Sequence, residues 1–159
     1  MYRWDNRTRS GLRVIVAAMM LIITQLAWVA FDTQPAAAAS GFRSLDAPKR
    51  LLDTRPGEKT ADGEFQAQGA LGGGKVLELT VAGRVGLPDE PTAVMLNVTV
   101  TAPVDHGFVT VYPCGKRPNA STVNYAPSQT VPNAVIATVS GDGTVCLYTY
   151  KTTHLIVDV

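Results

Sequence analysis

The residues that could support catalysis are few in this chain of 159 residues, and their spacing assembles no reactive centre. Nucleophilic catalysis needs a nucleophile beside a base, and a third group that orients the base. His154 and Asp158 have an even spacing, which places both on one face of a strand. Ser121 and Ser128 lack the Gly-x-Ser-x-Gly elbow that exposes the nucleophile of many hydrolases. We therefore expect no enzymatic activity, and we expect His154 to be a half-buried strand residue bonded to a neighbour.

Potential metal ligands are equally sparse. The chain has two histidines, His106 and His154, and two cysteines, which is too few for a zinc site if the cysteines are bridged. Asp142 lies between two glycines, but Ca²⁺ needs several oxygen ligands. We expect neither a metal site nor a cofactor.

Asp53 and Arg55 are the most prominent charged pair, and they precede a turn at Pro56-Gly57. One interpretation is a charged binding pair. The interpretation that we favour is structural, because an arginine can satisfy several acceptors and fix the turn. We assign the same structural role to Asn97, His154 and Asp158.

The candidate ligand-binding residues are amides and a phenol, namely Asn119, Asn124, Tyr125, Gln129 and Asn133. Such groups can hydrogen-bond sugar hydroxyls, with Tyr125, Tyr112 or Tyr148 as an aromatic platform. In the alternative interpretation, Asn97, Asn124 and Asn133 bond backbone groups where a β-ladder is interrupted.

The N-terminus has the pattern of an export signal. Residues 3–13 contain four arginines, residues 14–31 are almost entirely apolar, and Pro35 begins a run of small residues. We predict a signal peptide over residues 1–39, cleaved after Ala39, with cleavage after Ala37 or Ala38 as alternatives. An uncleaved membrane anchor is the competing interpretation, because the apolar run is close to the length of a membrane-spanning helix.

Removal of this leader changes the composition that matters for function. Four arginines and two aspartates leave with it, so the remaining chain is nearly neutral. Nucleic acid and anionic lipid both require a basic surplus, so we expect neither as a partner. Both tryptophans also belong to the leader, which weakens the case for sugar stacking.

Two cysteines, Cys114 and Cys146, remain in the exported part. An even number of cysteines in an exported chain favours a disulfide, and two free thiols are the alternative.

Residues 40–48 are predicted to be a tether, and residues 49–159 to be one domain. Short β-branched and aromatic runs, separated by turn-forming residues, predict an all-β antiparallel sandwich of jelly-roll or Greek-key type. About eight strands are expected, at residues 50–53, 75–82, 93–101, 108–112, 121–125, 134–140, 144–150 and 153–159.

Three features of this pattern make finer predictions. Residues 57–74 are polar and glycine-rich, which indicates a long mobile loop. Gly141-Asp142-Gly143 predicts a hairpin turn that pairs residues 134–140 with residues 144–150. The last strand is expected in the interior of a sheet, because a terminal strand is stable only when it is paired.

The Arg-Leu-Leu-Asp-Thr-Arg-Pro-Gly motif at residues 50–57 forms part of a wider pattern. Further segments of the pattern occupy residues 96–101, 107–115, 117–121, 124–125, 129–133 and 153–159. Together they resemble a secreted β module that recurs in actinobacterial exported proteins, alone or attached to other domains. The resemblance covers most of residues 48–159 and implies an extracellular β domain, but it carries no reaction or ligand.

We therefore expect a secreted or cell-surface module, without catalysis, for structural or protein-interaction roles at the cell envelope. The alternative is a module that binds carbohydrate or cell-wall glycan. The expected partners are envelope proteins or cell-wall glycan, and a membrane only if the leader is kept.

Overall fold

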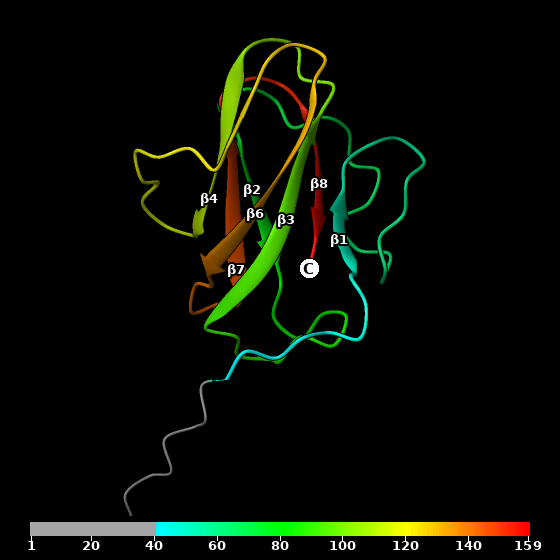
Figure 1. Ribbon diagram of the computed structural model, residues 1–159, viewed down its shortest axis with the longest axis vertical. Coiled ribbons are helices and arrows are strands. Elements are labelled where there is room, and N and C mark those ends of the chain that lie inside the picture. Colours follow the sequence, from blue (N-terminus) through cyan, green and yellow to red (C-terminus); the bar gives the residue numbers. More distant parts are fainter. Residues whose placement is uncertain (1–40) are drawn as a thin grey trace, which may run out of the picture. The chain divides into compact units, whose positions relative to one another are not determined.

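The computed structural model describes residues 41–159, and the compact unit Ser44–Val159 consists of strands and loops (Figure 1). The signal peptide predicted over residues 1–39 lies outside the described residues. The strands are β1 (Arg50–Asp53), β2 (Val76–Thr80), β3 (Ala93–Thr101), β4 (Gly107–Pro113), β5 (Val123–Tyr125), β6 (Thr130–Thr138), β7 (Thr144–Thr149) and β8 (His154–Asp158). Within the part described, we find no helix long and apolar enough to cross a membrane.

The eight strands form two antiparallel sheets of four, which confirms the predicted sandwich. The first sheet has the order β1-β8-β3-β6 and the second has the order β2-β7-β4-β5. The pairs β1–β8, β2–β7, β3–β6 and β4–β5 are all antiparallel. This nested pairing is the topology of a jelly roll. β8 lies between β1 and β3, so the terminal strand is in the interior of a sheet, as predicted.

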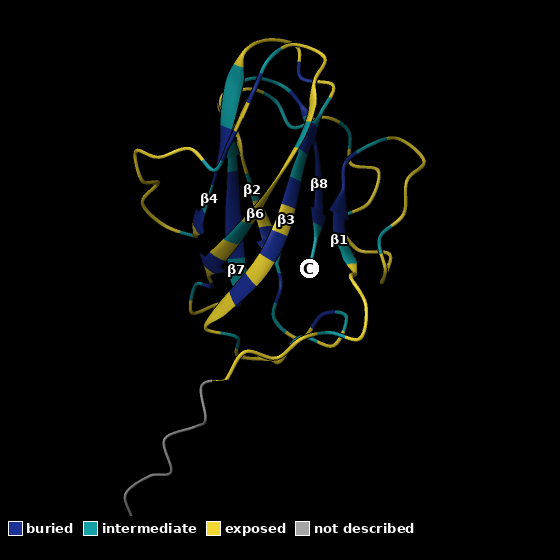
Figure 2. Ribbon diagram, in the orientation of Figure 1, coloured by how far each residue is buried: buried dark blue, intermediate teal, exposed yellow. Residues whose placement is uncertain are grey.

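Alternation of side chains along the strands builds the core between the sheets. In β3, Val94 and Leu96 are buried whereas Met95 and Asn97 are exposed, and Figure 2 shows the alternation as bands along the strand. Burial of each such aliphatic side chain stabilises the fold by about 1.5–3 kcal/mol. The pattern breaks in β1, where a register shift turns both Leu51 and its neighbour Leu52 into the core.

The hairpin predicted between residues 134–140 and 144–150 is wrong. Gly143 N donates to Ser140 O at 2.9 Å, so a tight turn does form. However, Gly143 O accepts hydrogen bonds from the backbone of Val81 and Ala82, which directs β7 toward β2. β6 pairs with β3 in the other sheet, so the turn crosses between sheets.

β6 also begins earlier than predicted, at Thr130 rather than at residue 134. Proline is disfavoured within a sheet because it has no N–H to donate, and Pro132 therefore obscured the start of the strand. In the structure β6 is the last strand of its sheet. An edge strand tolerates proline when the missing N–H faces away from the sheet.

Residues 57–74 contain no named strand, as expected of a loop, but the segment is hydrogen-bonded to the edge of β1. Ala61 N donates to Arg50 O at 2.9 Å, and Ala67 N donates to Asp53 O at 2.8 Å. Phe65 and Leu71 pack against the core. The loop thus covers the open side of β1.

Candidate functional site

The Asp53 carboxylate lies at the end of β1, fully buried, and is surrounded by cationic donors. It accepts hydrogen bonds from Arg55 N, Nε and Nη2 at 3.1, 3.0 and 2.7 Å, and from Arg50 Nη1 at 3.0 Å. Burial raises the pKa of Asp53, but the hydrogen bonds and charge of Arg55 outweigh it and hold the pKa below its ordinary value. Arg50 Nε also donates to Asp158 Oδ1 at 2.9 Å. These charges therefore have partners within the fold, and they anchor the turn that follows β1.

His154 and Asp158 project from β8 but have different partners. His154 Nδ1 lies 3.1 Å from Thr54 Oγ1, whereas Asp158 is paired with Arg50. Ser121 and Ser128 are exposed, and neither bonds a histidine within residues 41–159. Over the same residues, no cluster of three His, Cys, Asp or Glu side chains could hold a metal ion.

Two of the tyrosines proposed as an aromatic platform are buried. Tyr125 and Tyr112 are each only 5% exposed. The Tyr125 hydroxyl lies 2.9 Å from Thr149 Oγ1 and accepts a hydrogen bond from Lys151 N at 3.2 Å. The platform prediction is therefore wrong for Tyr125 and Tyr112, because their rings face protein atoms.

The amide residues of the predicted ligand set are exposed, and two of them make hydrogen bonds within the fold. Gln129 Oε1 accepts a hydrogen bond from Ala126 N at 2.9 Å and closes a local turn. Asn133 Nδ2 donates to Thr122 O at 2.7 Å, which links β6 to the segment before β5. Asn119, in the segment before β5, and Asn124, in β5, are also exposed.

Asn97 does not interrupt its strand. It is an exposed residue of β3 that pairs with Ala134 on one side and Asp158 on the other. The expectation that the Asn97 side chain bonds backbone groups at an interruption of the β-ladder is therefore wrong.

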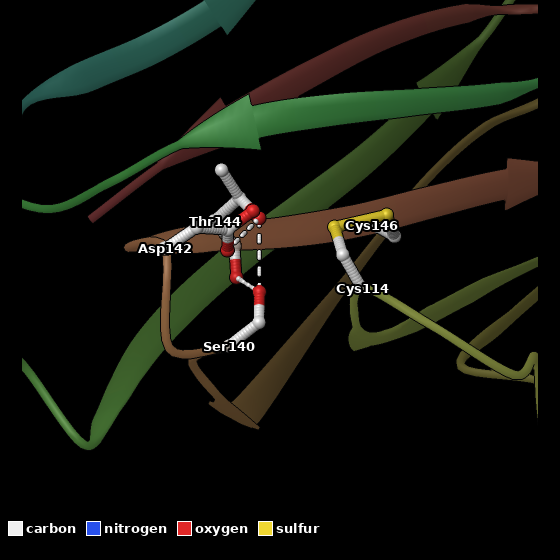
Figure 3. The surroundings of a disulfide bond; sticks show 5 residues. All are labelled: Cys114, Ser140, Asp142, Thr144 and Cys146. Carbon is white, nitrogen blue, oxygen red and sulfur yellow. Dashed lines mark hydrogen bonds between the residues drawn. A yellow bond between two sulfur atoms is a disulfide. The ribbon is translucent and has the colours of Figure 1, made fainter.

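The predicted disulfide is confirmed. Cys114 and Cys146 are bonded across 32 residues of sequence, and Figure 3 shows the bridge beside β7. In the chain-entropy model, closure of a loop of this length stabilises the fold by about 3–4 kcal/mol. Near the bridge, Thr144 Oγ1 donates to Asp142 Oδ1 at 2.8 Å, which fixes the turn before β7. The bridge therefore holds the segment after β4 against the second sheet.

β6 presents a long open edge. Val139 N donates to Thr92 O at 3.0 Å, so Thr92 and Val139 form a hydrogen-bonded pair directly next to Ala93–Thr138, the first residue pair of the β3–β6 ladder. Bonded and non-bonded pairs alternate in an antiparallel ladder, so the N–H groups of Ala134, Ile136 and Thr138 point away from β3.

The other three edges differ from β6. The loop at residues 57–74 covers β1, β5 has only three residues, and β2 carries Glu78. Natural edge strands are commonly protected by charged residues, by short length or by a covering segment. β6 has nine residues, none of them charged, and Pro132 is its single protecting residue.

An apolar patch lies beside the open edge. Ile136 is 75% exposed and pairs directly with Met95, which is 52% exposed. Sequence reasoning missed this surface because Pro132 concealed the strand. The signal that could have found it is the lack of charge in residues 129–140.

No protein-family model, no curated protein and no solved structure matches this chain.

Proposed function

We propose that residues 49–159 form a non-catalytic extracytoplasmic module that binds a partner protein at the cell envelope through the edge of β6. The observation that carries this proposal is a nine-residue, uncharged edge strand beside two exposed apolar side chains, Met95 and Ile136. Because β6 leaves three N–H groups without a β-strand neighbour, it offers the backbone template that β-augmentation uses.

The proposed location rests on chemistry rather than on resemblance alone. The export pattern of residues 1–39 precedes the domain, and the disulfide between Cys114 and Cys146 is of the kind that persists in oxidising compartments. Near-neutral charge without the leader favours a protein partner over nucleic acid.

The partner is expected to add a strand to the first sheet. Its main-chain carbonyls would accept the N–H groups of Ala134, Ile136 and Thr138, and its apolar side chains would cover Ile136 and Met95. Main-chain bonds supply affinity in this mode, and side-chain contacts supply specificity.

The test is site-specific photo-crosslinking in the cells that make the protein. A crosslinker at Met95 probes the face beside β6 without altering β6, and one at Val104, which is 67% exposed, serves as the reference. Ala134→Pro removes one outward N–H without breaking a β3 bond, and Ala134→Ser is the matched control. We expect a discrete adduct from Met95 that is lost in Ala134→Pro and kept in Ala134→Ser.

Two results would count against the proposal. One is an adduct pattern that is the same from Met95 and Val104. The other is an adduct from Met95 that persists in Ala134→Pro while that variant has the thermal stability of Ala134→Ser.

A further inference from the structure

Aromatic side chains gather on the outer face of the second sheet, which the β6 proposal does not involve. Phe108 of β4 lies with its ring centroid 5.3 Å from that of Tyr150, and the two ring planes differ by 9°. Tyr148 of β7 lies 6.0 Å from Phe108. Tyr150 is 49% exposed, and Phe108 and Tyr148 are partly exposed. The strands thus hold three rings together at the surface.

The register adds a polar group to this cluster. Phe108 pairs with Asn124 across the β4–β5 ladder, and burial alternates along β5 so that Asn124 faces solvent. Asn124 is one of the residues that the sequence indicated as sugar-binding. Its amide therefore stands beside an aromatic ring, which is the combination expected of a polar-aromatic binding surface.

A guanidinium group closes one side of the cluster. Arg117 lies with its Cζ atom 4.0 Å from the centroid of the Tyr148 ring. Among residues 41–159, no carboxylate forms an ion pair with Arg117. By contrast, Lys151 on the other side, 5.5 Å from the Tyr150 ring, is paired with Asp105 at 3.3 Å. Arg117 thus has no carboxylate within ion-pair distance among the described residues.

Two bonds within the fold restrain the loop that carries Arg117. Its loop is anchored at one end by the disulfide at Cys114, and near the other end Thr110 Oγ1 donates to Ala120 O at 2.6 Å. A guanidinium that is stacked and anchored in this way loses little freedom when it binds an anion. Its fork of donors matches a carboxylate, which it can bind with two parallel hydrogen bonds.

We infer that the face formed by Phe108, Tyr148, Tyr150, Asn124 and Arg117 binds a polysaccharide of uronic acid residues. The C–H face of a sugar is attracted to the negative face of an aromatic ring, which Tyr150 and Phe108 supply. The Asn124 amide hydrogen-bonds the hydroxyl groups of the sugar, and Arg117 pairs with its carboxylate. This ligand uses the Tyr150 and Phe108 rings together with Asn124 and Arg117, whereas a neutral glycan leaves Arg117 without a role.

The inference is tested by isothermal titration calorimetry on the full chain, produced in an exporting host with its disulfide intact. The ligands are polygalacturonate, alginate and hyaluronate. We expect at least one of them to bind, and we expect Arg117→Gln to weaken that binding about tenfold, the loss of a charge-assisted hydrogen bond. Lys116→Gln, an exposed neighbour with the same change of charge, is the matched control and should leave binding unchanged.

Variants at Tyr150 separate stacking from folding. Tyr150→Ala should weaken binding by a similar factor, whereas Tyr150→Phe retains the ring and should retain binding. Circular dichroism and thermal unfolding establish that each variant is folded before it is titrated.

Two further ligands isolate the chemistry. Methyl-esterified polygalacturonate has the same sugar backbone with masked carboxylates, and polyglutamate has carboxylates without sugar. The inference is overturned if no uronic acid polymer binds, if the esterified polymer or polyglutamate binds as tightly as its counterpart, or if Lys116→Gln weakens binding as much as Arg117→Gln. None of these results bears on β6, so the two proposals fail separately.

Discussion

Arg84 joins the two sheets, and its removal should destabilise the domain strongly. It is only 9% exposed, and it donates to Leu51 O of β1 at 3.0 Å and to Thr80 O of β2 at 2.8 Å. Its Nε and Nη2 atoms each lie 2.8 Å from a carboxylate oxygen of Asp62, and its guanidinium lies over the Phe65 ring at 4.9 Å. One side chain therefore bonds two strands and the loop that covers β1.

The cost of Arg84→Ala follows from these contacts. Two backbone carbonyls would each lose a hydrogen bond worth about 1 kcal/mol. Asp62 would lose a paired charge in a partly buried site, and loss of one partner of a buried pair costs about 3–5 kcal/mol in all. We therefore expect Arg84→Ala to lower the free energy of unfolding by about 4 kcal/mol.

Urea unfolding, followed by far-ultraviolet circular dichroism, measures this loss. With a slope of about 2 kcal/mol per molar urea, the midpoint should fall by about 2 M. Arg84→Lys keeps the charge but loses the planar fork, and it should lie between wild type and Arg84→Ala. A loss below about 1 kcal/mol in Arg84→Ala, or independent effects of Arg84→Ala and Asp62→Asn in a double-mutant cycle, would refute this account.

Two further substitutions test the turn before β7 and the ion pairs after β1. Gly143 has a φ of 79°, and an added Cβ would lie 2.5 Å from the Ala82 Cβ, so Gly143→Ala should cost about 3 kcal/mol in thermal unfolding. Gly141→Ala meets nothing within 4 Å, and an equal effect of the two substitutions would contradict the steric explanation. The Asp53 pKa lies below 3.8 in the fold, so the stability that its carboxylate provides is present above that pH and is lost as pH falls through the folded pKa. Asp53→Asn should therefore be less stable than wild type by about 3 kcal/mol at neutral pH, and a difference that stays constant in unfolding curves down to about pH 2 would disprove the linkage.

The sequence predicted those parts of the fold that depend on local alternation. In β3 every second residue from Val94 to Val100 is an aliphatic side chain, and nothing in the strand competes with that pattern. The disulfide could be predicted equally well from the sequence, because the chain has only two cysteines.

Which strands pair with each other could not be predicted from the sequence in the same way. A tight turn at Gly143 fits a hairpin and a crossover equally well, and the bonds that decide between them come from Val81 and Ala82, far away in sequence.

The candidate surfaces could not be predicted from the sequence for the same reason. Phe108 and Tyr150 become neighbours only because β4 pairs with β7, so no spacing in the sequence brings them together. Arg84 is hidden in a loop, and two of its partners are backbone carbonyls that carry no sequence signature. Tyr125 shows the converse error, because a tyrosine near polar residues resembles a binding residue until its burial is known.

The pairing of β1 with β8 determines how the domain would respond to a pulling force. Lys49 N donates to Val159 O at 2.8 Å, so the two ends of the strand-bearing unit meet at one rung. Because the strands are antiparallel, a force that pulls these ends apart acts on the paired residues of β1 and β8 one pair after another, starting at the ends, rather than on all pairs at once. The Arg50–Asp158 ion pair, at 2.9 Å, lies at the rung next to the ends. Mechanical opening would therefore begin at the two backbone hydrogen bonds between Lys49 and Val159, and the Arg50–Asp158 ion pair would break next as β1 separates from β8.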